Sequence, residues 1–80
     1  MASTVGELLM VRVGVEARDL EDLLETLAGL DFPVNPELFP CGAVTTVEFP
    51  AYAHQLEAIY VVLPEHAQVE AISMLAGVGL

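Results

Sequence analysis

The sequence predicts an α+β domain with element order βαββαβ, a four-stranded antiparallel sheet of strand order 4-1-3-2, and two helices on one face. Three observations lead to this prediction. Apolar residues alternate without a break over residues 7–17, and leucines at helical spacing follow over residues 20–30. Prolines at positions 36, 40, 50 and 64 then divide the rest of the chain into segments of strand or helix length.

The first strand is expected at Glu7–Ala17. One of its faces is apolar at every position, which is typical of a half-buried strand. The other face changes along its length, from apolar residues at Leu8 and Met10 to charged residues at Arg12 and Glu16. Because this strand has the longest apolar run in the chain, we expect it in the centre of the sheet.

An amphipathic helix is expected over residues 19–30. Asp19 stands at the N-cap position, and leucines at positions 20, 23, 24, 27 and 30 form one stripe that faces the core. Gly29 and Pro33 are the stop signals.

Two short strands are expected next, at Glu37–Phe39 and over residues 43–49. A proline stands on each side of the first one, and since proline gives no N–H to a ladder, that strand belongs at the sheet edge. The turn between the two strands is placed at Pro40-Cys41-Gly42, and Pro50 ends the second strand.

Residues 56–63 fit two structures. Apolar residues at positions 56, 59, 60 and 63 form a helical stripe, whereas the run Ile59–Val62 is typical of a strand. A strand here would need a hairpin loop after Pro50 without Gly, Asn or Asp, and would give the order βαββα. A helix over residues 53–63, ended by Pro64, leaves residues 68–75 free to form an alternating fourth strand. We favour the helix because it completes two split β-α-β units.

The length and the net charge of the chain limit the functions it can have. Eighty residues predict one domain, residues 1–80, with a flexible N-terminus at residues 1–6. The net charge of −10, from twelve acids against two arginines, argues against nucleic acid and against anionic membranes as partners. The N-terminus has no basic leader, and no apolar run approaches the ~20 residues that span a bilayer, so we expect a cytoplasmic protein.

Catalytic and metal-binding motifs are missing from the sequence. No phosphate-loop, dinucleotide, zinc-protease or hydrolase string occurs, so no cofactor is predicted and a non-enzymatic role is favoured. Cys41, His54 and His66 are the soft metal ligands of the chain. Because a helix of about 15 Å separates the two histidines, one subunit cannot bring both to one metal, and a site shared between subunits stays open.

Arg12 and Arg18 are the only two cations. We expect Arg12 to pair with Glu48 on a neighbouring strand, and Arg18 to pair with Asp22 one helical turn later. The alternative is that Arg12 and Arg18, together with Glu48, bind an anionic small molecule.

Six segments in order, MVRVGVEA, LEDLLETLAGL, ELF, TTVEF, LEAIYVVL and VEAISML, give the chain a pattern that resembles the ferredoxin-like βαββαβ domains over about residues 7–75. Among these domains it is similar to the ACT-like regulatory modules. The resemblance implies a regulatory module that assembles and that binds a small ligand beside the loop after the first strand. In this chain that loop, residues 16–19, lacks the glycine that often lets a ligand approach there.

The sequence therefore predicts a non-enzymatic regulatory or oligomerisation module, which also could bind a small metabolite. The alternative is a small dimeric ferredoxin-like enzyme or metal-binding protein. A sheet with both helices on one side leaves its other side bare, and we expect a homodimer or higher homo-oligomer joined through that side. The predicted interface residues are Leu8, Met10, Val44, Ile72 and Met74.

Overall fold

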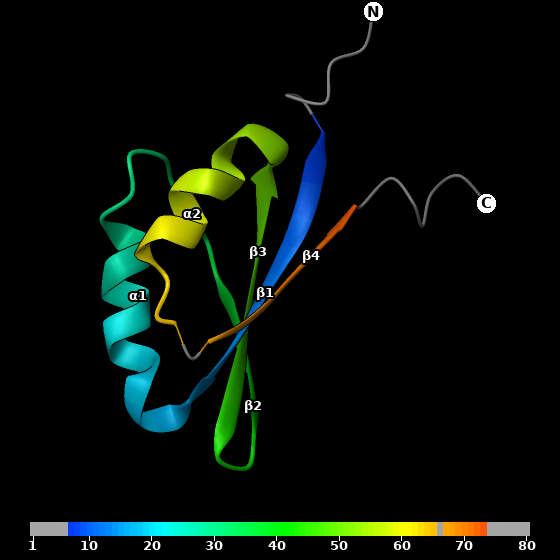
Figure 1. Cartoon of the computed structure of the whole chain (residues 1–80). Coiled ribbons are helices and arrows are strands. Elements are labelled where there is room, and N and C mark those ends of the chain that lie inside the picture. Colours follow the sequence, from blue (N-terminus) through cyan, green and yellow to red (C-terminus); the bar gives the residue numbers. More distant parts are fainter. Residues whose placement is uncertain (1–6, 66, 74–80) are drawn as a thin grey trace, which may run out of the picture.

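The computed structural model describes residues 7–65 and 67–73, which form an α+β domain with the predicted order βαββαβ (Figure 1). Its main elements are β1 (Leu8–Glu16), α1 (Leu20–Ala28), β2 (Glu37–Cys41), β3 (Val44–Tyr52), α2 (Leu56–Val62) and β4 (Gln68–Ser73). Within the described ranges, neither helix combines the length and the apolar character that a membrane crossing requires. The N-terminus at residues 1–6, His66 and Met74 lie outside the described residues.

The four strands form one antiparallel sheet of order β2-β3-β1-β4, which is the predicted order read from the opposite edge. β1 is central, as its long apolar run predicted, and β2 with its proline is an edge strand. The register puts Val11 opposite Phe49 on β3 and opposite Ala71 on β4. Since side chains alternate along a strand, the odd-numbered residues of β1 and β3 share one face of the sheet.

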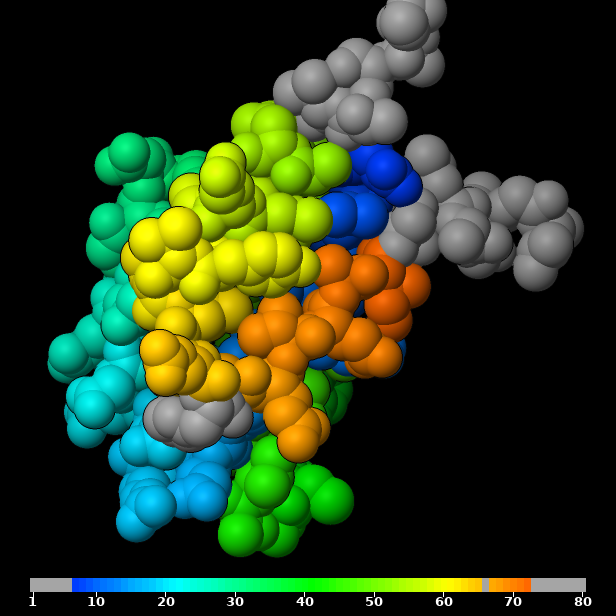
Figure 2. All heavy atoms as spheres, in the orientation of Figure 1, coloured from blue at the N-terminus to red at the C-terminus, as the bar shows by residue number. Residues whose placement is uncertain are grey.

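The hydrophobic core lies on that odd-numbered face. Both helices contribute to it, because Leu23 and Leu27 of α1 and Ile59 of α2 belong to the same buried cluster as the valines of β1. In Figure 1 both helices stand to the left of the strands. Figure 2 shows from the same side that β4 side chains, in orange, lie at the surface. The remaining buried members of this core cluster are Val11, Val13, Val15, Val47, Phe49 and Ala51.

Residues 56–62 are helical, which confirms the favoured alternative. A 3-10 turn, Ala53–Gln55, precedes α2. The sequence offers no Ser, Thr, Asp or Asn as a cap there, but the side-chain Oε1 of Gln55 accepts the backbone N–H of Tyr52 at 2.9 Å. Ile59 is fully buried and Val61 is 78% exposed, as expected for residues two apart on a helix rather than on a strand.

The hairpin between β2 and β3 differs from the prediction. Cys41 is the last residue of β2 and pairs with Val44, so the turn is Gly42-Ala43 and not Pro40-Cys41-Gly42. Gly42 has a φ of 64° at the first loop position, as in a type II′ turn, whose twist matches that of the strands. The predicted end of the strand at Pro50 is also wrong, because β3 continues to Tyr52. β2 pairs with β3 only as far as Glu48, so beyond that residue β3 has a free edge, where Pro50 is tolerated.

Candidate functional site: the outer face of the sheet

The outer face is the side of the sheet opposite the core cluster, and we define it by Met10, Arg12 and Gly14 of β1. These residues alternate with the buried valines of the same strand. The register fixes the residues beside them, which are Pro50, Glu48 and Thr46 on β3, and Ile72, Glu70 and Gln68 on β4.

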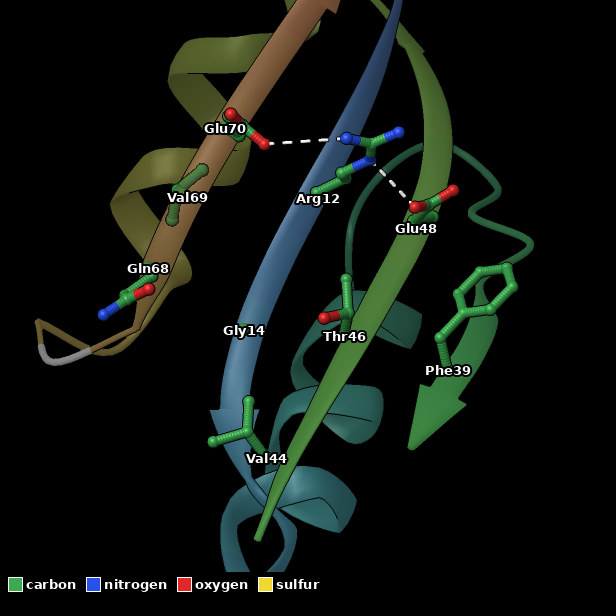
Figure 3. A pocket seen from close by; sticks show the side chains of 9 residues that line it. All are labelled: Arg12, Gly14, Phe39, Val44, Thr46, Glu48, Gln68, Val69 and Glu70. Atoms are coloured by element: carbon green, nitrogen blue, oxygen red, sulfur yellow. Dashed lines mark ion pairs between the residues drawn. The ribbon is translucent and has the colours of Figure 1, made fainter. Parts of the chain in front are cut away.

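A row of charged residues crosses the middle of the outer face. Arg12 Nε lies 2.8 Å from Glu48 Oε2, which confirms the predicted cross-strand pair (Figure 3). Arg12 Nη1 lies 3.7 Å from Glu70 Oε1 on the other side. Glu37 of β2 is opposite Glu48, so this charged row holds one cation and three carboxylates. An anionic ligand that approached Arg12 would therefore be repelled by these carboxylates.

A hollow of about 600 Å³ lies next to the charged row. Gly14 forms part of its wall and contributes no side chain, so the backbone of the central strand is accessible there (Figure 3). The walls come from all four strands and combine apolar, amide and hydroxyl groups with the charged row. They are formed by Arg12, Gly14, Phe39, Val44, Thr46, Glu48, Gln68, Val69 and Glu70.

Apolar side chains are exposed around the charged row. Val44 is 44% exposed and Ile72 is 39% exposed, both on the outer face, while Leu8 and Met10 are half-buried there. Four of the five predicted interface residues are therefore on one face, and Met74 lies outside the described residues. Phe39, which the sequence did not single out, is 47% exposed beside the hollow.

Arg18 does not join the hollow. Its side chain is 82% exposed, and its Nε lies 2.8 Å from Glu16 Oε1. The predicted pair of Arg18 with Asp22 is wrong, because Ala17–Asp19 forms a 3-10 turn before α1 begins. Residues 18 and 22 consequently do not stand one α-helical turn apart. Of the three predicted ligand-binding residues, the structure brings Arg12 and Glu48 together and places Arg18 elsewhere.

The two soft metal ligands among the described residues, Cys41 and His54, lie beyond opposite ends of β3. Cys41 is exposed at the end of β2, and the ring of His54 stacks on that of Tyr52, with centroids 5.9 Å apart. In the part of the chain that the structure describes, no three His, Cys, Asp or Glu side chains are grouped closely enough to hold a metal ion.

Six residues at the hollow were missed by sequence reasoning: Gly14, Phe39, Thr46, Gln68, Val69 and Glu70. A glycine between two valines in the interior of a strand was the signal that could have found the site, since such glycines often mark a close approach of a ligand or another backbone. A scan of the chain against models of known protein families finds no match, and a search of curated proteins finds no significantly similar sequence.

Proposed function

We propose that this chain is a small non-enzymatic module that associates with itself through the outer face, with both helices covering the other face in the ferredoxin-like manner. Assembly of this kind is what the likeness to ACT-like regulatory modules leads us to expect. A single cysteine that forms no disulfide fits a reducing cytoplasm.

The observation that carries this proposal is the apolar surface around the charged row. Phe39, Val44 and Ile72 are each between 39% and 47% exposed, and all three lie on the outer face. Phe39 and Val44 lie on one side of the charged row and Ile72 lies on the other. Soluble monomers seldom leave a large apolar patch in water. An apolar fraction of 55% in an 80-residue chain is high for a domain with so much surface to cover. Burial against a second copy removes this surface from water.

The size of the face sets the expected affinity. Four strands at about 4.8 Å spacing and a central strand of nine residues at about 3.4 Å each give a footprint on the order of 500 Å², since the edge strands are shorter. A standard interface buries about 800 Å² per partner, so this interface is at the small end. Each buried apolar Å² contributes about 25 cal/mol before the cost of association is subtracted. We expect a dissociation constant in the micromolar range.

A second candidate function is the binding of a small molecule in the hollow. Its volume of about 600 Å³ lies within the range of about 300–1,000 Å³ that is usual for ligand sites. Because carboxylates flank Arg12 on both sides, a zwitterion fits this charge pattern better than a simple anion. Thermal-shift screening against amino acids, nucleotides and divalent metals tests this candidate.

Sedimentation equilibrium tests the self-association. The wild type should run at twice the 8.5 kDa of one chain at tens of micromolar, and Met10→Lys and Ile72→Lys should run as folded monomers. Val61→Lys is the matched control, because Val61 is exposed on α2 and lies away from the outer face. Circular dichroism shows whether each variant is folded. A wild type that stays at 8.5 kDa, or a control that dissociates as readily as Met10→Lys, would contradict the proposal.

A further inference from the structure

Gly14 is a feature of the outer face that the fold itself does not require. It is not among the glycines with positive φ, so its backbone conformation is open to other residues. A Cβ atom at position 14 would meet nothing closer than 3.9 Å, on Gln68 and Val44. Since glycine weakens the interior of a strand, its place in the central strand indicates that something approaches the backbone from outside.

Along β1 the outer face presents three different surfaces in sequence. Met10 projects an apolar side chain, Arg12 stands in the charged row, and Gly14 opens the hollow. Side chains on one face of a strand are about 6.8 Å apart, so the projection and the hollow are equally far from Arg12.

This equal spacing suits a two-fold axis. Consider a two-fold axis that lies between two facing sheets, runs at right angles to β1 and passes over Arg12. Rotation about this axis places β1 of one copy antiparallel to β1 of the other. It therefore brings residue 10 of one copy over residue 14 of the other. We propose that Met10 of each copy fills the hollow above Gly14 of a second copy, an inference that rests on the self-association proposed above.

The neighbouring strands fit the same operation. Ile72 is opposite Met10 on β4, and Gln68 is opposite Gly14, so the axis also brings Ile72 of one copy over Gln68 of the other. Ile72 of one copy thus covers the β4 side of the other copy's hollow, which Met10 does not reach. Aligned sheets cross at about 30°, which shifts these contacts along the strands without changing which ends meet.

The other face-to-face arrangement leaves the hollow empty. An axis parallel to β1 sets Met10 against Met10 and Gly14 against Gly14. The two hollows would then join into one void between the copies. Interfaces pack as densely as protein interiors, and atoms that line a void lose their contacts. The antiparallel arrangement is therefore the one that the shape of this face favours.

Disulfide trapping tests which residues meet. In a Cys41→Ser background, Met10→Cys and Gly14→Cys chains of different mass are mixed at equal concentration in a glutathione redox buffer. We expect the mixed disulfide between the two chains to be the main cross-linked product. A dominant Met10→Cys homodisulfide from a protein that sediments as a dimer would overturn the antiparallel arrangement and leave self-association standing. A protein that stays monomeric in sedimentation would contradict both.

Filling the hollow tests its occupant separately. Gly14→Leu should raise the dimer dissociation constant at least about tenfold, and Gly14→Ala should have a smaller effect. In the double variant Gly14→Leu/Met10→Ala the new side chain takes the place that the partner's methionine left, so dimerisation should recover. Circular dichroism and the melting temperature show that the variants fold. A dimer that tolerates Gly14→Leu unchanged would show that the hollow is not part of the contact, and would overturn the inference.

Discussion

Ile59 should contribute more than any other side chain of α2 to holding this helix on the sheet, since Leu56 packs against the core only partly buried. Ile59 is the one fully buried side chain of this seven-residue helix. Replacing it by alanine removes three carbons, worth about 2.4 kcal/mol at ~0.8 kcal/mol each. The cavity left behind adds about 1 kcal/mol or more, and the better helix propensity of alanine returns about 0.4 kcal/mol. We therefore expect Ile59→Ala to lower the free energy of unfolding by about 3 kcal/mol. In a domain of this size that corresponds to a fall in Tm of about 12–24 °C.

Val61→Ala is the matched control, since it shortens a β-branched side chain on the same helix. Val61 is 78% exposed, so the free energy of unfolding should change by no more than about 0.5 kcal/mol. Urea denaturation followed by circular dichroism, at a concentration below that of dimerisation, measures both variants. Ile59→Val, expected to cost about 0.5–1.5 kcal/mol, extends the series if the alanine variant is too unstable. Equal losses at positions 59 and 61 would mean that the two side chains share one face, as in a strand, and would refute the reasoning.

Two further predictions concern charge and capping. Two facing copies bring more carboxylates than arginines to the charged row, and salt screens their repulsion, so raising the salt concentration should tighten the dimer. At low salt, Glu70→Gln should tighten the dimer more than the control Glu57→Gln on α2 does. A dimer that weakens with salt would contradict this. Gln55→Ala removes the acceptor of the Tyr52 N–H and should lower the free energy of unfolding by about 0.5–1.5 kcal/mol. Gln55→Glu keeps a side-chain oxygen as acceptor and should change the free energy of unfolding less. Equal losses for the two variants in a urea titration would show that this hydrogen bond is not the cause.

Local pattern was sufficient for most of the fold. The alternation in β1 and the leucine stripe of α1 are properties of single segments, so these two elements could be predicted locally. The pattern of residues 56–63 fitted both a helix and a strand, and the choice between them came from the topology that the helix completes. The pair of Arg12 with Glu48 could be predicted because it needs only two neighbouring strands with the right faces.

The errors and omissions depended on how segments meet. The hairpin turn was placed too early, at residues 40–42 in place of 42–43, because the pairing of Cys41 with Val44 is set by the type II′ turn and not by the preceding proline. The hollow above Gly14 exists because Gln68 on β4 and Val44 on β3 do not fill the space beside it. That is a property of three strands in register, and no single segment carries it.

The two edges of the sheet differ in what they offer to an added strand. β2 is an edge strand that contains Pro40, and a proline has no backbone N–H to donate to an added strand. β4, the other edge strand among the described residues, is free of proline. Fibrillar growth by strand addition needs a competent edge at both ends of each unit. A chain docked on β4 would thus present another proline-bearing edge, and propagation into a fibril would stop after one closed pair.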